Sequence, residues 1–212
     1  MNKPAKLGED GMRNGCLTKE QAYIVGFITG DGNLSKSQPL IRMYDSDKHF
    51  THNVLKPLFN RAFNKMPRVI YDKHNNGYVV YSYSKRIWNT LKQIGIPTGA
   101  KSRIVRVPLI IKKGIDEIKS SYIAALFDAE GSTDEIIEQK RHPRGYIYFQ
   151  LKMYNPTLIN QIAELLHEII GIKPRTYHYD YGSILRINGP RQVKRCLKYL
   201  NVKHPRFSFI LI

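Results

Sequence analysis

Cysteine, acidic residues and long apolar runs are scarce in this chain of 212 residues. Its two cysteines, Cys16 and Cys196, lie far apart and belong to no CxxC pair, which argues against a disulfide framework and against a zinc site. No apolar run approaches the roughly 20 residues that span a bilayer, and residues 1–15 lack the apolar core of a signal peptide. We therefore expect a soluble, intracellular protein that is not secreted and does not enter a membrane.

The shortage of acidic residues gives the chain a strong positive charge. Lys and Arg number 34 against 17 Asp and Glu, for a formal net charge of +17. Such an excess indicates a polyanionic partner, with nucleic acid as the first candidate and an anionic membrane as the second. With 42% hydrophobic residues, the chain is long enough for two small folded domains or one of moderate size.

Two short stretches of the chain are nearly the same. Residues 23–32 read YIVGFITGDG and residues 122–131 read YIAALFDAEG, each an apolar helix-like run that ends in one carboxylate followed by glycine. Small residues lie where two such helices cross closely: Gly26, Gly30, Ala125 and Ala129. Parallel packing brings Asp31 and Glu130 together, and two carboxylates at helix C-termini attract a hard divalent cation such as Mg²⁺.

At residues 24–32 and 123–131 the chain resembles, position by position, the motif of the LAGLIDADG homing endonucleases. The match is specific at the acids and the terminal glycines, and it departs from the motif at Thr29, where the family has Asp, and at Ala125, where it has Gly. The resemblance implies an α+β fold of two pseudo-symmetric αββαββα halves in a single chain, with antiparallel, saddle-shaped sheets and the two motif helices as the interface.

The rest of the chain also repeats. The segment at residues 40–45 (LIRMYD) has a counterpart at residues 149–155 (FQLKMYN), and Asp45 and Asn155 are predicted to cap helices that run to residues 63 and 170. Each copy then has a Pro-Arg strand start and a hairpin, with turns at residues 75–77 and 180–182. The final helices are predicted at residues 85–94 and 191–200.

These repeats predict the domain organisation. Thr18 and Gln21 form a capping-box signal, so residues 1–17 are predicted to be an N-terminal arm. The first half then covers residues 18–102, a linker covers 103–117, and the second half covers 118–212. An insertion from Ser132 to Gly145 makes the second copy longer, and it is predicted to be a basic hairpin loop. Because the halves are unequal, we expect a long, asymmetric target site.

One face of each predicted sheet is basic and aromatic. At residues 146–154 the apolar and polar side chains alternate strictly, which is typical of a strand with one face in the core and one in solvent. Such a ribbon fits a DNA major groove, although any single residue on it is better explained as part of a solvated face, and only the whole set favours DNA binding. The predicted DNA-binding residues are Gln38, Arg42, Tyr44, Arg68, Lys140, Arg141, Arg144, Tyr146, Tyr148, Gln150, Lys152, Arg175, Tyr177, Tyr179, Arg186 and Asn188.

Hydrolysis of a phosphodiester bond needs an activated water and a stabilised leaving group, and a carboxylate-bound divalent ion supplies both. Asp31 and Glu130 are predicted to be the metal ligands and catalytic acids. The resemblance implies that the carbonyls of Gly30 and Ala129 also approach the metal, which is Mg²⁺ with Mn²⁺ as a substitute. It further implies that both strands of double-stranded DNA are cut across a minor groove, leaving short 3′ overhangs.

The resemblance also places a basic residue beside each acid, at the start of the last helix of each half. Lys85 and Arg191 occupy these positions, and a phosphate contact or a solvated helix start is an equally good interpretation of each. Some relatives have Gln at the end of the second strand, where this chain has Tyr44 and Tyr154.

Two other patterns are weak. Residues 95–102 (GIPTGAKS) nearly match a phosphate-binding loop, but Ala100 replaces a required glycine and a helix precedes the segment, so we expect a helix stop and turn. His49 and His52 lack a further ligand nearby and are read as an exposed helix face.

The sequence therefore predicts a monomeric, metal-dependent, site-specific double-strand DNA endonuclease of the homing type. The main alternative is an RNA maturase acting on intron RNA, or a DNA-binding regulator, with the same fold. A basic protein that binds RNA or an anionic membrane without specificity is a third possibility.

Overall fold

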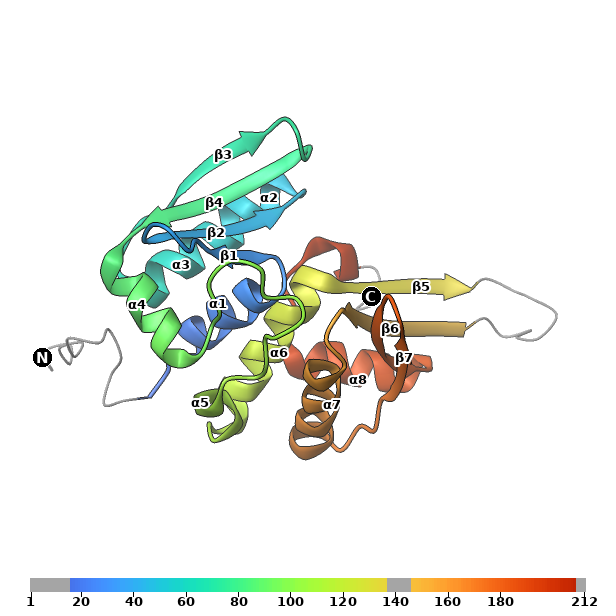
Figure 1. The fold of residues 1–212 in the computed structure, drawn as a ribbon. Helices are drawn as coiled ribbons and strands as arrows, with labels where there is room; N and C mark the ends of the chain where they lie inside the picture. Colours follow the sequence, from blue (N-terminus) through green and yellow to red (C-terminus); the bar gives the residue numbers. More distant parts are fainter. Residues whose placement is uncertain (1–15, 137–145, 209–212) are drawn as a thin grey trace, which may run out of the picture.

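The computed structural model describes residues 16–136 and 146–208. The chain is an α+β protein in which two antiparallel sheets flank a central pair of helices (Figure 1). The first part contains α1 (Lys19–Thr29), β1 (Gly32–Leu34), β2 (Leu40–Asp45), α2 (Lys48–Phe50), the π-helical turn η1 (Thr51–Leu55), α3 (Lys56–Phe63), β3 (Arg68–Asp72), β4 (Gly77–Tyr83) and α4 (Lys85–Ile94). The second part contains α5 (Leu109–Lys112), α6 (Asp116–Glu130), β5 (Gly131–Ile136), β6 (Tyr146–Met153), α7 (Pro156–Ile170), β7 (Arg175–Tyr179), β8 (Gly182–Asn188), α8 (Pro190–Leu200) and the 3₁₀ turn η2 (Pro205–Phe207).

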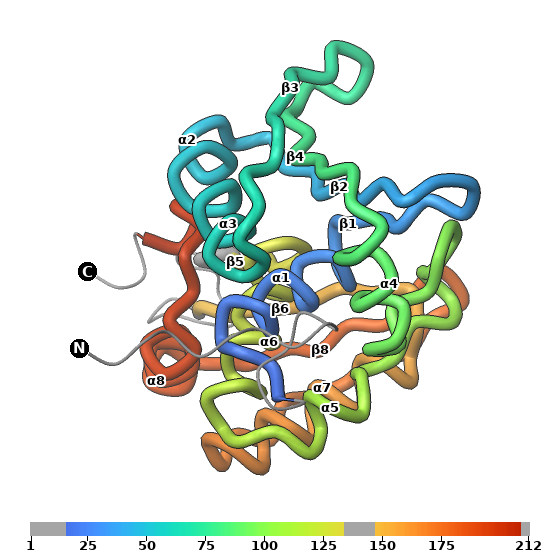
Figure 2. The backbone as a smooth tube through the Cα atoms, turned by 90° about the vertical axis from the view of Figure 1, so that its left-hand side faces the viewer, coloured from blue at the N-terminus to red at the C-terminus, as the bar shows by residue number. Residues whose placement is uncertain are grey.

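The two sheets have the same topology. The strand order is β1-β2-β4-β3 in the first sheet and β5-β6-β8-β7 in the second, with every pair antiparallel. In both views the first sheet lies above α1 and α6, and α5 and α7 lie below them (Figures 1 and 2). This repetition confirms the predicted fold of two pseudo-symmetric halves.

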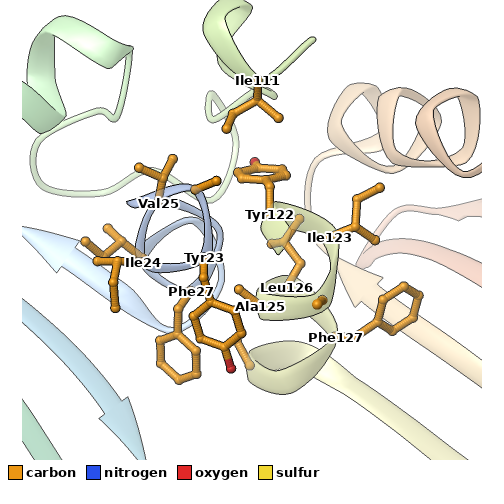
Figure 3. Packing of buried hydrophobic residues seen from close by; sticks show 14 of the residues in the cluster. Tyr23, Ile24, Val25, Phe27, Ile111, Tyr122, Ile123, Ala125, Leu126 and Phe127 are labelled. Atoms are coloured by element: carbon orange, nitrogen blue, oxygen red, sulfur yellow. The ribbon is translucent and has the colours of Figure 1, made fainter. Parts of the chain in front are cut away.

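Helices α1 and α6 pack at unusually close range because glycine lines their contact. A Cβ built on Gly26 would lie 2.3 Å from the Tyr122 carbonyl oxygen, and one built on Gly30 would lie 2.7 Å from the Ala129 Cβ. Gly26 contacts Tyr122, and Gly30, four residues later on α1, contacts Ala129, which is also later on α6; the two helices are therefore parallel. Figure 3 shows the buried side chains around this contact. The predicted small-residue interface is confirmed.

The ends of the helices follow from local chemistry. Thr18 and Gln21 form the predicted capping box at α1, and the Asn155 side chain accepts the Thr157 N–H at the start of α7. The prediction that Asp45 caps the next helix is wrong, because Asp47 is the cap of α2 and accepts the Phe50 N–H at 2.8 Å. The Asp45 carboxylate instead accepts the Asp47 N–H at 2.7 Å and contacts His204 of the second half at 3.4 Å.

Alternating burial gives each sheet a core face and a solvent face. In β6, Phe149, Leu151 and Met153 are buried, as the sequence pattern predicted. Helix α6 begins at Asp116, inside the segment predicted as a linker, and residues 132–136 of the predicted insertion belong to β5. Within the two described ranges, no helix has the length and apolar character needed to span a bilayer.

Candidate metal centre and nucleic-acid interface

Asp31 and Glu130 meet where the two central helices end. Asp31 follows α1, Glu130 is the last residue of α6, and the two carboxyl groups are hydrogen-bonded to each other. Burial first and the neighbouring Glu130 second raise the pKa of Asp31 from 3.8 to about 7, whereas Lys101 and Arg206 oppose the increase. Burial likewise raises the pKa of Glu130. The raised pKa values favour retention of a proton by the pair near neutral pH, in spite of the two neighbouring cationic side chains.

Two basic side chains flank the acids, and sequence reasoning missed both. The Lys101 ammonium donates a hydrogen bond of 2.6 Å to the Gly30 carbonyl, and the Arg206 guanidinium donates one of 3.3 Å to the Ala129 carbonyl. Burial lowers the pKa of Lys101, while the charges of Glu130 and Asp31 raise it. Both residues come from irregular segments that follow the last helix of a half, and one of these segments is the near-match to a phosphate-binding loop.

Lys85 and Arg191 lie elsewhere, so their predicted place beside the acids is wrong. The Tyr44 N–H bonds the Asp31 carbonyl, Tyr44 pairs with Val79 on β4, and Lys85 is six residues further along the chain. At about 3.3 Å per residue, this separation is roughly 20 Å. Arg191 lies far from Glu130 for the same reason. Glu130 directly precedes Gly131, which pairs with Leu151, and α8 begins at the opposite end of the second sheet.

A third carboxylate, Asp128, lies on α6 two residues before Glu130 and is fully buried. It accepts hydrogen bonds from the Tyr23 hydroxyl at 2.6 Å and from the backbone N–H of His204 at 2.8 Å. Burial raises the pKa of Asp128 and these donors oppose the increase. The counterpart of Asp128 in the first half is Thr29, whose hydroxyl accepts a 3.3 Å bond from Tyr122.

The segment after the last helix of each half contacts the other half. The Val105 carbonyl, after α4, accepts a 2.7 Å hydrogen bond from the Asn155 side chain of the second half. His204, after α8, reaches Asp45 of the first half at 3.4 Å, and Arg206 approaches the same carboxylate at 4.0 Å. The two segments therefore cross-link the halves on either side of the acid pair.

The solvent face of each sheet carries a row of polar side chains. Register places Asn33, Arg42, Tyr81 and Arg68 across the first sheet, and Ser132, Gln150, Arg186 and Arg175 across the second. Arg186 donates two hydrogen bonds to the Gln150 side chain and lies 4.4 Å from the centre of the Tyr148 ring. Sequence reasoning missed Asn33, Tyr81 and Ser132, although alternation along β4 gave a signal for Tyr81.

The other predicted DNA-binding residues are distributed along the same sheets. Tyr44 is on β2, Tyr146 and Lys152 are on β6, and Asn188 pairs with Tyr148. Gln38 is exposed before β2 and accepts a hydrogen bond from Tyr83. Tyr177 and Tyr179 are on β7, and the Tyr179 ring stacks on Tyr181. Lys140, Arg141 and Arg144 lie outside the described residues.

A pocket of about 310 Å³ opens beside Glu130. Basic and aromatic side chains line it, including Lys101, Lys152, Tyr154 and Tyr181. The Lys152 ammonium lies 5.4 Å from the Tyr181 ring centre, and the Arg103 guanidinium lies 4.7 Å from that of Tyr154. This lining suits a phosphate group next to an unstacked or edge-on base.

The donor set at the centre fits a hard cation. Within residues 16–136 and 146–208, no cluster of three or more His, Cys, Asp or Glu side chains is placed to hold a metal. Mg²⁺, however, is commonly held by one or two carboxylates and completes its octahedral shell with water and substrate phosphate oxygens. The raised pKa values of Asp31 and Glu130 show that two ionised carboxylates are unfavourable here, and a bound cation would relieve their repulsion.

Comparison with known proteins finds a family model that matches part of the chain. Residues 117–201 match the model described as the LAGLIDADG-like domain. None of the curated proteins is similar enough in sequence to match. Several solved structures do match in fold at low sequence identity.

The structure of I-DmoI in complex with DNA and Mn superposes with a TM-score of 0.62 at 14% identity, covering 88% of this chain and 98% of that chain. The N-terminal LAGLIDADG domain of DUF199/WhiA gives a TM-score of 0.57 at 12% identity, covering 94% and 87%. Full-length DUF199/WhiA from Thermatoga maritima gives 0.60 at 13% identity, covering 96% of this chain and 63% of that chain.

Proposed function

We propose that this chain, whose residues 117–201 match the LAGLIDADG-like domain, is a metal-dependent, site-specific double-strand DNA endonuclease of the homing type. The observation that carries the proposal is the pair Asp31 and Glu130, buried together at the ends of two parallel helices. A protein that only binds DNA has no need of two carboxylates that repel each other at the centre of its fold, because the burial of each is unfavourable.

The proposed metal ligands are the carboxylates of Asp31 and Glu130 with the carbonyls of Gly30 and Ala129. A bound Mg²⁺, or Mn²⁺ in its place, supplies Lewis-acid activation of water and stabilises the leaving oxygen. Structures of I-DmoI contain DNA with Mn or Ca. Lys101 and Arg206 donate hydrogen bonds to the two carbonyls, which supports a role for both basic groups beside the scissile phosphates.

Other residues of the chain bind the DNA and stabilise charge on its phosphates. The basic, aromatic faces of the two sheets bind a long, asymmetric duplex, and their charge attracts the phosphate backbone. Lys101 and Arg206 stabilise the negative charge that develops on the phosphates, replacing the predicted Lys85 and Arg191 in this role. We propose that the protein acts as a monomer and cuts both strands, leaving short 3′ overhangs.

A second candidate function is DNA binding without cleavage, or maturase activity on intron RNA. The observation that favours it is the fold match to DUF199/WhiA, whose name does not describe an endonuclease. Because identities of 12–15% establish only a shared fold, cleavage has to be measured directly.

The test is a cleavage assay on a randomised double-stranded DNA library with Mg²⁺. The parent is compared with Asp31→Asn and Glu130→Gln, and Glu117→Gln is the matched control because it makes the same change at the exposed start of α6. We expect specific cuts by the parent and the control, and a loss of double-strand cutting in the two acid variants. Binding without any cut by the parent supports the second candidate, and unaltered cutting by the acid variants contradicts the metal assignment.

A further inference from the structure

The chain segment that carries Arg206 is fastened to the buried carboxylate of Asp128. The Lys203 N–H lies 2.9 Å from both carboxylate oxygens, and the His204 N–H lies 2.8 Å from one of them. A third donor, the Tyr23 hydroxyl, reaches the same carboxylate from α1 at 2.6 Å. Since each of these partners donates, Asp128 serves purely as an acceptor and holds its neighbours in one geometry.

The segment has little freedom beyond this attachment. The Arg206 N–H bonds the His204 ring at 3.1 Å, and the Phe207 ring is fully buried edge-on against Phe149. The Arg206 guanidinium extends over the end of α6 and donates to the carbonyl oxygens of Asp128, Ala129 and Gly131. Its position relative to Glu130 therefore depends on where Asp128 holds the backbone at residues 203 and 204, together with the approach of the guanidinium to Asp45 at 4.0 Å.

Among the described residues of the first half, no buried carboxylate holds the equivalent segment. At the position equivalent to Asp128, the Thr29 hydroxyl bonds its own helix, donating to the Val25 carbonyl at 2.8 Å. The segment that leads to Lys101 is attached to β1 instead, where the Gly99 N–H bonds the Leu34 carbonyl at 2.7 Å. The two basic groups beside the acid pair thus rest on unrelated supports.

We infer that Asp128 and Tyr23 form a positioning unit for the Arg206 guanidinium, and that this unit sets the cleavage rate of one DNA strand separately from the other. The inference rests on the proposed nuclease function. Asp128 and Tyr23 are at most 2% exposed, so they act on the DNA only through Arg206. A displacement of about 1 Å in a catalytic group is enough to slow a reaction strongly.

Two buried tyrosines provide a matched pair for the test, Tyr23 on α1 and Tyr122 on α6, both labelled in Figure 3. Tyr23→Phe removes the hydroxyl that bonds Asp128, and Tyr122→Phe removes the equivalent hydroxyl, which bonds Thr29. Both changes are made in buried residues of the same interface. Any general effect on stability is therefore expected in both variants, whereas an effect through Arg206 is expected only in the first.

The assay follows each strand of an end-labelled target duplex under single-turnover conditions. We expect Tyr23→Phe and Asp128→Asn to lower the cleavage rate of the same DNA strand that Arg206→Ala affects. The expected decrease is about tenfold or more, which is the effect of losing roughly one hydrogen bond in the transition state. The other strand should stay within about twofold of the parent, and Tyr122→Phe should leave the ratio of the two rates unchanged. Equal slowing of both strands by Tyr23→Phe overturns the inference.

A second measurement does not depend on cleavage. Nitrogen-15 NMR of the Arg206 side chain reports the exchange and shift of its guanidinium protons in the free protein. We expect these signals to change in Tyr23→Phe and Asp128→Asn and to persist in Tyr122→Phe. If the parent cuts neither strand, the nuclease proposal fails and this spectrum alone decides: guanidinium signals that stay the same in Tyr23→Phe and Asp128→Asn overturn the inference.

Discussion

Replacing Asp31 with asparagine should stabilise the metal-free protein at the same time as it abolishes cleavage. The pKa of Asp31 is raised from 3.8 to about 7, so the folded state binds this proton more tightly than the unfolded state does. At about 1.36 kcal/mol per pKa unit, the shift corresponds to a penalty of ~4 kcal/mol for the ionised folded protein. Asparagine never ionises and escapes the penalty.

The direction of the pKa shift of Asp31 determines how the stability of the protein depends on pH. Between the two pKa values the folded state holds more protons than the unfolded state, so the stability of the parent decreases as pH increases through this window and levels off above about pH 7. The gain from Asp31→Asn should therefore be close to zero at about pH 3, about 1–2 kcal/mol at pH 5 and ~4 kcal/mol at pH 8.

The assay is urea unfolding in EDTA at these three pH values. Asp116→Asn is the matched control, because it removes an exposed acid from the first turn of α6 and should cost about 0.3–1 kcal/mol through the helix dipole. Added Mg²⁺ should stabilise the parent by mass action and leave Asp31→Asn nearly unchanged. A variant that is no more stable than the parent at pH 8, or whose gain does not shrink in acid, would refute the reasoning.

Three further predictions concern packing, catalysis and recognition. Gly26→Ala should lower the free energy of unfolding by about 1–3 kcal/mol, because the new methyl meets the Tyr122 carbonyl at 2.3 Å; a normal urea midpoint would contradict the close helix contact. Lys101→Met should reduce the cleavage rate by about 10²-fold with little change in DNA affinity, measured by single-turnover kinetics beside a binding titration, and an equal loss of both would assign Lys101 to binding alone. Arg186→Ala should relax the preference at one base pair by about 1–3 kcal/mol in a library selection, whereas Lys194→Ala on the exposed side of α8 should not; an unchanged preference profile would place Arg186 on the phosphate backbone.

The sequence was sufficient wherever a periodic or local signal existed. Repeated motifs with small residues predicted the central helix pair, strict alternation predicted the buried face of β6, and Asn155 before Pro156 predicted the start of α7. In each case the evidence lay within a few residues of the element. The position of Asp31 against Glu130 followed because both residues end equivalent helices.

The basic residues beside the acids could not be predicted in this way. Lys101 and Arg206 belong to segments outside the main helices and strands, whose path depends on contacts with residues distant in sequence, in their own half and in the opposite half. The helix starts at Lys85 and Pro190 were recognisable, and this made the neighbouring basic residues attractive but misplaced candidates. The prediction for Asp45 failed because Asp47 is an equally good local cap, and the Asp45 carboxylate accepts the Asp47 N–H instead of capping the helix itself.

The reciprocal docking of the segments at residues 101–105 and 203–206 limits how the protein can be recombined. In a chimera that joins the first half to a foreign second half, the domain boundary drawn from sequence would separate each segment from the residue it docks on, Asn155 for one and Asp45 for the other. Exchange of halves should therefore succeed only when each transferred half meets a compatible docking residue. New cleavage specificities are more safely built by changing the solvent faces of the sheets and keeping both segments as a pair.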